Sequence, residues 1–355
     1  MPKKVGIILV NYQDYATRFL IACRDSLRAQ TYPSDLFQVY IVDNASSPES
    51  RDFLKNNYSE AVILSRADGN YAAANNLGFR RAQADGCQYL LTLNMDTELA
   101  PDCLAELVKG LDSNQETAIV QAKILLYPKN EAEKTRPKIN SLGNIFHFLG
   151  FGFTSHYQEE DRLLGGYPEI KGYASGCAFM IRTEFWEKTG FYNEDFYMYH
   201  DDIELSLKVR LAGGKIRLAP AAKVYHKYEF ERSRQMLYYM ERNRLLTIFS
   251  FYPFYLLLLI APPFIFLQIG MFFYALISAW AKTALAVYGY FLRPSTYVKI
   301  YRYRRDIRRW QVLKFSRLAL DFSGRIEFQE IANPVLNKLV NPLLDLYWRL
   351  IRKII

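Results

Sequence analysis

Amide and carboxylate side chains directly follow the first two apolar runs of the chain. Asn11 and Tyr12 come after residues 5–10, and Asp43 comes after residues 39–42. A carboxylate at the end of a buried strand can accept a hydrogen bond from a nucleobase N–H or from a ribose hydroxyl. The stretch Asp-Asn-Ala-Ser that starts at Asp43 is also typical of a plain turn, so this signal is weak by itself.

The fourth apolar run, residues 89–93, is followed by Asn94 and Asp96. Alternate residues of a strand face the same way, so this amide and this carboxylate could reach one divalent cation. Mg²⁺ and Mn²⁺ prefer oxygen ligands of this kind and can bridge to a substrate diphosphate. The pair is a candidate metal site, with a strand-end turn as the alternative.

The stretch 68–78 starts with Asp68, contains Asn76 and is rich in alanine. It opens a predicted helix over residues 72–84. Small residues allow the backbone to approach a ligand, and the N-terminus of a helix attracts phosphate. A helix that packs closely on a sheet would favour the same small residues, so both interpretations remain open.

Two adjacent acids, Asp201 and Asp202, stand at the start of a predicted helix over residues 202–212. With Glu204 they could form a capping box in which Asp201 caps the helix, and the motif alone favours this structural interpretation. Alternatively, one carboxylate could act as a general base toward an acceptor hydroxyl. His226 ends another strand-like run, and a lone histidine is more often structural than a ligand.

Strand-like and helix-like stretches alternate through the first half of the chain, which predicts a parallel sheet covered by helices on both faces. Sheets of this kind bind ligands at the C-terminal ends of their strands. The predicted strands are residues 5–10, 39–42, 61–64, 89–93, 119–124, 173–181 and 215–218, and the predicted helices are residues 17–29, 48–56, 72–84, 184–188 and 202–212.

The order and spacing of these motifs together strongly resemble glycosyltransferase family 2, over about residues 5–244. The resemblance is closest to the bacterial rhamnosyltransferase-like branch of that family. The motifs read Asn-Tyr (11–12), Val-Asp-Asn-Ala-Ser (42–46), Asn-Asn-x-Gly (75–78), Leu-Asn-x-Asp (93–96), Gly-x-Ala-x-x-Ile-Arg (176–182), Phe-Tyr-Met-Tyr-x-Asp-Asp (196–202) and Tyr-His (225–226).

The resemblance implies an inverting, metal-dependent glycosyltransferase with a GT-A fold, which is a Rossmann-like mixed α/β sheet with helices on both faces. Mn²⁺ or Mg²⁺ is the implied cofactor. The polar stretch 129–138 is then either a solvated surface excursion or a mobile lid that limits water at the site. The implied roles are catalysis for Asp202 and Asp201, nucleotide-sugar binding for Asn11, Tyr12, Asp43, Asp68, Asn76, Asn94 and Asp96, the acceptor side for Gly176 and Ala178, and metal ligation for Asp96, Asn94 and His226.

Four positions depart from the family's usual pattern. Asn94 replaces the first acid of Asp-x-Asp, and Asp201 replaces a glutamate. Asn70 stands where the branch usually has glycine, and Asp68 stands where it has asparagine.

The net charge of +9 comes from the C-terminal third of the chain. Residues 245–355 contain 15 Lys and Arg against 5 Asp and Glu, whereas the first 244 residues contain 30 against 31. This distribution indicates an anionic membrane surface rather than nucleic acid, for which no binding motif is present. The four cysteines are far apart and form no metal-type pair, which predicts a reducing compartment.

Residues 245–281 contain no charged side chain. One helix of that length would measure about 55 Å, too long for a single crossing of a bilayer. We therefore predict two apolar segments that are broken at Pro262 and Pro263, either crossing as a hairpin or re-entering, with a buried pair in a soluble core as the alternative. The expected regions are a catalytic domain (1–244), a membrane segment (245–281) and basic amphipathic surface helices (282–355).

These observations predict a membrane-associated enzyme whose catalytic domain faces the cytoplasm, as the arginine-rich stretch 301–310 indicates. The expected donor is dTDP-rhamnose or a UDP-sugar, and the expected acceptor is a lipid-linked glycan of cell-surface polysaccharide synthesis. The alternatives are a nucleotidyltransferase, which would have less use for Asp202 and His226, and an inactive membrane scaffold. A dehydrogenase is disfavoured, because no Gly-x-Gly-x-x-Gly follows the first strand.

Overall fold

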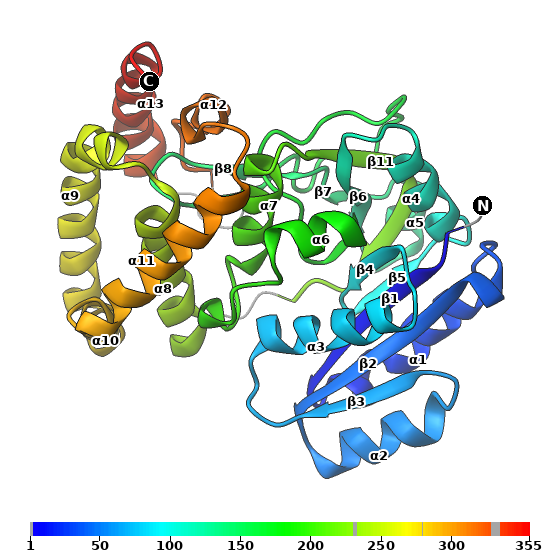
Figure 1. Ribbon diagram of the computed structural model, residues 1–355. Helices are drawn as coiled ribbons and strands as arrows, with labels where there is room; N and C mark the ends of the chain where they lie inside the picture. The colour runs from blue at the N-terminus through cyan, green and yellow to red at the C-terminus, as the bar shows by residue number, and fades with distance from the viewer. Residues whose placement is uncertain (1–2, 230–232, 279, 328–333) are drawn as a thin grey trace. The chain divides into compact units, whose positions relative to one another are not determined.

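The computed structural model divides into two compact units (Figure 1). Residues 145–153 interrupt the first unit in sequence but belong to the second. The first unit ends at residue 229, and the boundary predicted at residue 244 lies inside a helix of the second unit. The structure describes residues 3–229, 233–278, 280–327 and 334–355.

The first unit is built on a mixed sheet with the strand order β3-β2-β1-β4-β10-β6-β11-β5, and β7 pairs with β6. Strands β3, β2, β1 and β4 are parallel, and β10 is antiparallel to both of its neighbours. A separate pair, β8 and β9, forms a two-stranded sheet. The strands are β1 (Val5–Gln13), β2 (Phe37–Ser46), β3 (Val62–Arg66), β4 (Tyr89–Leu93), β5 (Thr97–Leu99), β6 (Thr117–Leu126), β7 (Ile139–Ser141), β8 (Asn144–Phe146), β9 (Gly152–Thr154), β10 (Ala178–Arg182) and β11 (Lys215–His226).

Helices cover both faces of the sheet, with α1, α2 and α4 on one face and α3, α6 and α7 on the other (Figure 1). The predicted strands and helices are found in the predicted order, but helix α4 was not predicted, and the antiparallel β10 makes the sheet mixed rather than parallel. The helices are α1 (Tyr15–Arg28), α2 (Pro48–Asn57), α3 (Tyr71–Ala84), α4 (Cys103–Asp112), α5 (Glu131–Thr135), α6 (Thr183–Thr189) and α7 (Asp201–Leu211), with short 3₁₀ turns η1 (Ser34–Leu36) and η2 (Glu194–Phe196).

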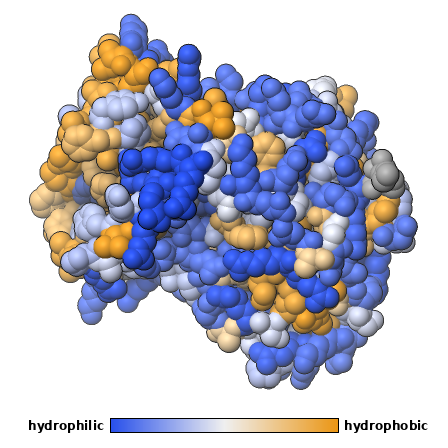
Figure 2. All heavy atoms as spheres, in the orientation of Figure 1, coloured by the Kyte–Doolittle hydropathy of each residue, from blue (hydrophilic) through white to orange (hydrophobic). Residues whose placement is uncertain are grey.

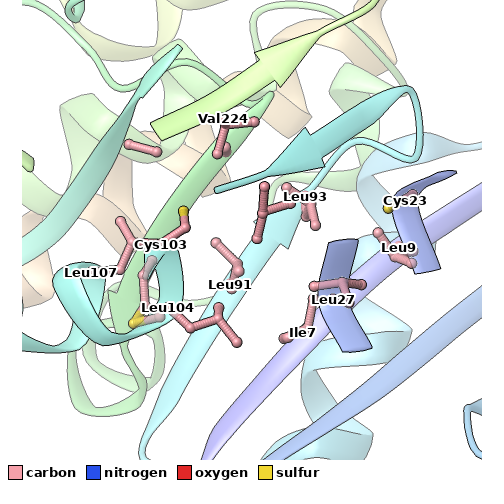
Figure 3. Packing of buried hydrophobic residues seen from close by; sticks show 14 of the residues in the cluster. Ile7, Leu9, Cys23, Leu27, Leu91, Leu93, Cys103, Leu104, Leu107 and Val224 are labelled. Atoms are coloured by element: carbon pink, nitrogen blue, oxygen red, sulfur yellow. The ribbon is translucent and has the colours of Figure 1, made fainter. Parts of the chain in front are cut away.

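Strand alternation divides the core into two layers. Ile7 and Leu9 of β1 pack against Leu27 of α1 and its neighbours (Figure 3), whereas Ile8 points to the other face, where it packs with Phe79 of α3. All five side chains are buried because successive residues of a strand face opposite sides and each side is covered by a helix layer.

The strand predicted over residues 173–181 is only half right, because β10 begins at Ala178. The backbone N–H groups just before it bind side chains rather than a neighbouring strand. Ala174 donates to Ser206 Oγ at 3.1 Å, and Ser175 donates to Gln121 Oε1 at 2.8 Å. Since these donors are satisfied by side chains, the segment becomes a fixed loop beside the sheet.

The polar stretch 129–138 contains helix α5 and is mostly exposed. Asn130 caps this helix, because its Oδ1 accepts a hydrogen bond from Glu133 N at 2.9 Å. The stretch is thus an ordered surface excursion, and a role as a lid stays a prediction.

Helix α9 is the one described helix that is long and apolar enough to cross a membrane, by length and composition alone. The predicted break at Pro262 and Pro263 is wrong, because α9 runs through both prolines. The boundary between two helices lies at Pro253 instead, between α8 and α9. Pro263 has no N–H to donate to Leu259 O, but the Tyr347 hydroxyl donates to that carbonyl at 2.6 Å. The helices of this unit are α8 (Arg234–Phe251), α9 (Phe254–Ile277), α10 (Ala281–Phe291), α11 (Pro294–Trp310), α12 (Phe315–Ala319) and α13 (Asn341–Ile351), with a π-helical turn η3 (Leu336–Val340) before α13.

The inserted segment 145–153 lies in the core of the second unit. Phe148 stacks on Trp348 with ring centroids 4.7 Å apart. The Arg244 guanidinium donates to Leu149 O at 2.7 Å, and the Tyr252 hydroxyl donates to Phe148 O at 3.0 Å. These contacts explain why the segment belongs with helices that follow it by a hundred residues.

Candidate active site

The ends of β1 and β2 lie side by side, because Asn11 pairs in register with Asp43. Asn11 Nδ2 donates to Asp43 Oδ1 at 2.9 Å, and Asn11 Oδ1 accepts from Ala16 N at the start of α1. Asp43 also accepts from Ser46 Oγ and from Arg51 Nε, the latter at 2.8 Å. Asn11 and Asp43 are both buried, so they form a fixed polar cluster at the edge of the sheet.

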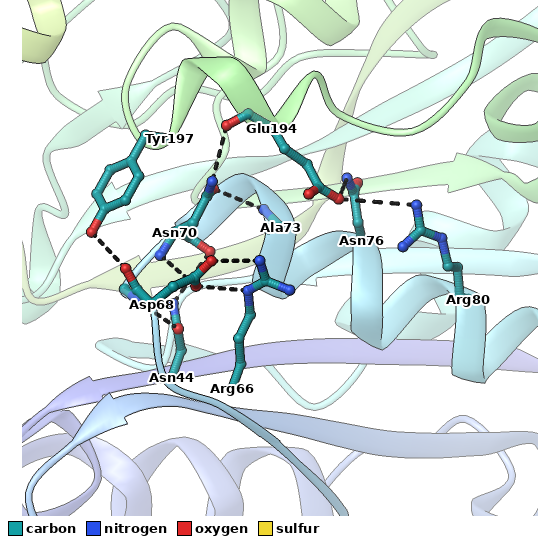
Figure 4. Close-up of polar contacts among 10 residues, drawn as sticks. Asn44, Arg66, Asp68, Asn70, Ala73, Asn76, Arg80, Glu194 and Tyr197 are labelled. Atoms are coloured by element: carbon teal, nitrogen blue, oxygen red, sulfur yellow. Dashed lines mark hydrogen bonds and ion pairs between the residues drawn. The ribbon is translucent and has the colours of Figure 1, made fainter.

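Asp68 lies in the loop between β3 and α3, where its carboxylate is paired with Arg66 at 2.7 and 2.5 Å (Figure 4). This pairing lowers the pKa of Asp68. The next residue, Gly69, has φ of +72° and donates its N–H to Asn44 Oδ1 at 3.1 Å. A Cβ there would lie 2.6 Å from the Tyr197 hydroxyl and 3.5 Å from the Tyr12 ring, so both tyrosines border this loop.

Asn70 explains one departure from the family's pattern. Its Oδ1 caps α3 by accepting from Ala73 N at 3.0 Å, and its Nδ2 donates to Glu194 O at 2.9 Å. Glycine could not make either contact. Figure 4 shows Glu194 beside the start of α3, with Asn70 and Asn76 both directed toward it.

Asn76 is buried and links α3 to the 192–194 segment by hydrogen bonds. Its Nδ2 donates to Tyr192 O and to Glu194 Oε1, both at 3.0 Å, and its Oδ1 accepts from Tyr192 N at 2.9 Å. Its side-chain contacts are thus made within the protein, where they fix the segment that leads to Asp201 and Asp202.

The turn between β4 and β5 carries Asn94 and Asp96. The expected strand alternation is wrong for this pair, because β4 ends at Leu93. Asn94 Oδ1 accepts from the Tyr71 hydroxyl at 3.2 Å, whereas Asp96 Oδ2 lies 3.3 Å from His226 Nε2. The pairing of β5 with β11 places His226 opposite Thr97, and this register brings the histidine to Asp96.

The Asp96–His226 pair is nearly buried and has an unused acceptor. Asp96 Oδ1 has no hydrogen-bond partner among the described residues. Burial by itself would lower the pKa of His226, but Cys177 and Asp96 raise it to about 10.

Gly176 and Cys177 join two parts of the site. Gly176 N donates to Asp202 Oδ2 at 3.2 Å, and Cys177 O accepts from Asn94 N at 2.9 Å. Ala178 follows as the buried first residue of β10. The segment 176–178 therefore contacts both the acidic start of α7 and the turn that carries Asp96.

The structural interpretation of the acidic pair as a capping box is wrong. Helix α7 starts at Asp201, and His200 occupies the cap position without a side-chain cap hydrogen bond. Glu204 instead forms an ion pair with Lys208 at 2.8 Å. Asp201 is thus not the cap residue, although Asp202 Oδ1 accepts from Ile203 N in the first turn at 2.8 Å.

The two aspartates differ in their surroundings. Burial raises the pKa of Asp201 well above its usual range, and the neighbouring charge of Asp202 raises it further. Burial also raises the pKa of Asp202, but only to about 6, because N–H groups of Gly176 and Ile203 favour its ionised form. Of the pair, Asp202 is therefore the carboxylate that ionises first.

The backbone before this pair is strained. Tyr197, Tyr199 and His200 have φ values of +66°, +61° and +60°, a left-handed conformation that is uncommon without glycine. Each such residue costs on the order of 1 kcal/mol and persists where surrounding contacts hold it. Ala72 N donates to Tyr197 O at 3.0 Å, and the Tyr197 hydroxyl donates to Asp68 O at 3.0 Å.

Two site residues were not found from the sequence. Tyr71 binds Asn94, and its pKa is raised by burial and by the charge of Asp201. Arg51 pairs with Asp43. Neither residue carries a distinctive sequence signal, since a tyrosine at a helix start and an arginine on an exposed helix are both common.

The residues present fit a divalent cation bound mainly by its substrate. Asp96 supplies an unused carboxylate oxygen, and His226 supplies an imidazole beside it, which would have to lose its proton to bind the cation. No group of three or more His, Cys, Asp or Glu side chains gathers at one point in the described parts of the chain. Further ligands would have to come from a diphosphate and from water.

Known proteins resemble this chain in both sequence and fold. Residues 6–188, just over half of the chain, match the family described as Glycosyl transferase family 2. The low-salt glycan biosynthesis hexosyltransferase Agl10 of Haloferax volcanii is 25% identical over 259 residues, which cover 69% of this chain and 76% of the relative. The O-antigen biosynthesis protein RfbC of Myxococcus xanthus is 28% identical over 211 residues, which cover 57% of this chain but 16% of RfbC.

Two solved structures share the fold. GalNAc-T7, crystallised with UDP, GalNAc and Mn²⁺, has a TM-score of 0.57 at 16% identity over 71% of this chain and about half (49%) of its own. The mannosyltransferase PcManGT of Pyrobaculum calidifontis, in complex with GDP-Man and Mn²⁺, has a TM-score of 0.50 at 14% identity over 100% of this chain and 88% of its own.

The mixed sheet and the two similar structures show a GT-A fold, and the predicted fold is thereby confirmed. The chain belongs to glycosyl transferase family 2. It is an enzyme of the class that transfers sugars from nucleotide-sugar donors.

Proposed function

We propose that this protein transfers a sugar from a nucleotide-diphosphate sugar to an acceptor hydroxyl, with inversion at the anomeric carbon and with Asp202 as the general base. The observation that carries this proposal is the asymmetric acidic pair at the start of α7. Asp202 ionises with a pKa of about 6, and the segment 176–178 ties it to the turn of Asp96. A base with a pKa near the working pH is suited to this task.

The proposed reaction is a single displacement. Asp202 accepts the proton of the acceptor hydroxyl while that oxygen forms a bond to the anomeric carbon. The bond between this carbon and the diphosphate oxygen breaks, and the electron pair leaves with the nucleoside diphosphate. Burial and the charge of Asp202 raise the pKa of Asp201, which disfavours a second negative charge beside the base.

For the donor side, we propose that Asp43, Tyr12 and Asp68 border the nucleotide, as the family resemblance implies. Asn11 and Asn76 make their hydrogen bonds inside the protein, so we infer that they position this region rather than contact the donor. Arg51 is about half exposed beside Asp43 and is a further candidate for contact with the donor.

Asp96 and His226 are the proposed ligands of Mn²⁺ or Mg²⁺, with Asn94 holding the turn through Tyr71. A cation bound there would neutralise charge on the departing diphosphate. The structures with UDP or GDP-Man and Mn²⁺ support this assignment by fold.

We propose dTDP-rhamnose or a UDP-sugar as the donor and a lipid-linked glycan as the acceptor, in the synthesis of a cell-surface polysaccharide. The names of Agl10 and RfbC, a glycan and an O-antigen biosynthesis protein, support this acceptor class. The apolar helix α9 and the basic C-terminal third support association with the cytoplasmic face of a membrane.

Thermal-shift measurements on detergent-solubilised protein test the donor site. UDP, dTDP, GDP, ADP and NAD are compared with and without Mn²⁺. One nucleoside diphosphate should stabilise the protein in a Mn²⁺-dependent manner, and Asp96→Ala should remove this effect. Glu98→Ala is the matched control, because Glu98 is an acid two residues from Asp96 whose carboxylate forms an ion pair with Lys227. No response to any diphosphate would favour the inactive scaffold.

Asp202→Asn tests the base. We expect transfer to fall at least about 10³-fold while the nucleotide-dependent thermal shift is retained. An equal loss of both would argue against the proposed role.

A further inference from the structure

Helix α9 exposes one uninterrupted apolar face along its whole length. Leu256, Ile260 and Ala275 are buried on the opposite side. The exposed side chains include no charged group. The large ones are Phe254, Tyr255, Leu258, Ile265, Phe266, Ile269, Phe273, Tyr274, Leu276 and Ile277, between 47% and 86% exposed.

A second apolar stripe follows the C-terminal helix. Every third or fourth residue from Leu339 onward is an exposed leucine or isoleucine, whereas Leu344 and Trp348 on the other side are buried. This spacing forms one helical face. The stripe consists of Leu339, Leu343, Leu346, Leu350 and Ile354, between 55% and 67% exposed.

One hydrogen bond joins the two helices beside their apolar faces. Tyr347 lies beside the stripe in the helical rotation of α13, and its hydroxyl donates to Leu259 O of α9. Exposed apolar surface of this extent is unusual for a soluble monomer and marks an interaction surface.

Helix α11 supplies the charge next to this surface. Arg304 donates to Phe249 O at 2.7 Å and to Tyr252 O at 2.8 Å, which fixes α11 at the turn just before α9 begins. Its exposed face mixes Tyr297 and Tyr301 with arginines. Figure 2 shows the strongly hydrophilic strip over α11 beside the apolar residues over α9. A mixture of tyrosine and arginine is typical of protein surfaces that lie in the headgroup layer of a membrane.

The contacts of α9 argue against a crossing of the bilayer. The Arg244 guanidinium, 1% exposed, binds Glu241 and also donates to Gln268 Oε1 at 2.5 Å. Gln268 is 14 residues beyond Phe254, about 21 Å along the helix axis. A crossing would therefore carry this ion pair deep into a hydrocarbon layer about 30 Å thick, where charges are costly.

We propose that the second unit docks into a single leaflet of an anionic lipid bilayer without crossing it. The exposed face of α9 and the stripe of α13 enter the acyl region, and the arginines of α11 bind the headgroups. The proposal rests on the membrane association included in the proposed function, and it specifies the mode of that association.

Depth measurements on vesicles of phosphatidylglycerol and phosphatidylcholine test the mode. A bimane label is placed at either end of α9 through Phe254→Cys or Ile277→Cys in the full chain. The native cysteines need no replacement, because all four are buried. Brominated lipids in the outer leaflet should quench both labels to the same degree. Access to the Ile277→Cys label for a quencher trapped inside the vesicle would show a crossing and overturn the proposal.

Vesicle binding by stripe variants tests the surface. Leu343→Glu combined with Leu350→Glu should weaken binding about tenfold or more, because the apolar surface of two leucines is no longer transferred from water into the acyl region. The matched control is Leu163→Glu, an almost fully exposed leucine of the first unit, which should change binding less than twofold. Arg305→Gln with Arg309→Gln should abolish the preference for phosphatidylglycerol over neutral vesicles.

Two results would overturn the proposal in this second test. One is unchanged binding by the stripe variant. The other is a dimer of the native protein that the stripe variant dissociates, since the surface would then belong to a second copy of the chain. Nucleoside diphosphate binding in detergent is measured on the same variants and should be unchanged. If the native protein bound no nucleoside diphosphate, the proposed function would be refuted, whereas the result on membrane docking would still stand.

Discussion

At the scale of single residues, the site depends on how two neighbouring carboxylates are made unequal. Asp201 is the more buried of the two, and the neighbouring charge further raises its pKa. Asp202 receives N–H donors from Gly176 and Ile203, which favour its charged form. Because these surroundings move the two pKa values apart, they favour different roles for the two carboxylates, with Asp202 as the base.

The pKa of Asp202 predicts the acidic limb of the pH profile. Below pH 6 this carboxylate is protonated and cannot accept a proton, so kcat should rise with pH through about 6 and level off above it. Steady-state kinetics from pH 5 to 8, at saturating donor and Mn²⁺, measure the limb. A flat profile would argue against Asp202 as the base.

Stability should depend on pH in the opposite direction. Because the folded-state pKa of Asp202 is raised above its ordinary value near 3.9, its contribution to stability is present below that value and is lost as pH rises through about 6. The melting temperature of the native protein should therefore fall relative to Asp202→Asn over this interval.

At the scale of elements, the site depends on the attachment of the 192–202 segment to α3. Asn76 provides three hydrogen bonds to this segment, and Asn70 provides another. Through this attachment, α3 and the loop that follows β3 hold the strained residues before α7 in place.

Asn76→Ala should loosen this attachment. We expect a loss of about 2–4 kcal/mol in the free energy of unfolding, because buried groups of Tyr192 lose their partners. Below the melting temperature, kcat should fall about tenfold while the donor KM changes little, since the segment leads to the base. Arg80→Ala is the control, because Arg80 contacts Glu194 only at 3.9 Å. An unchanged kcat would limit Asn76 to a structural role.

The proline pair in α9 provides a second test at this scale. Tyr347→Phe should cost about 1–2 kcal/mol, because it leaves Leu259 O without its donor. Pro263→Ala restores the N–H that belongs to this carbonyl in a regular helix, so the cost of Tyr347→Phe should nearly vanish in the double variant. Chemical denaturation of the four proteins in detergent measures this coupling, and additive effects would contradict it.

At the scale of the molecule, the inserted segment 145–153 links the folding of the two units. Phe146, Phe148 and Leu149 are fully buried within the second unit, although the chain on both sides belongs to the first. Removal of the second unit would expose this segment to water.

A chain truncated after residue 229 should therefore aggregate. Replacement of residues 145–153 by a short Gly–Ser connection should raise the soluble yield of the truncated chain several-fold, because the exposed apolar side chains are gone. Soluble yield and dye binding to exposed apolar surface measure the effect. Equal yields with and without the replacement would argue against this linkage.

The sequence by itself determined the class of fold and the places where chemistry could occur. The largely apolar run 89–93 reproduces β4 residue for residue, because a strand that is buried on both faces is mostly apolar. The polar residues after the apolar runs lie at the strand ends as predicted, since parallel strands share one C-terminal edge. These features are local, and local composition encodes them.

The tertiary structure decided which of those residues work together. It separated Asn94 from Asp96, joined Asp96 to His226 across β5 and β11, and linked Asn76 to the 192–194 segment. In addition, α9 continues through two prolines, because Tyr347, 88 residues after Leu259, donates to the Leu259 carbonyl. Each of these outcomes depends on a partner distant in sequence, and no local pattern identifies such a partner.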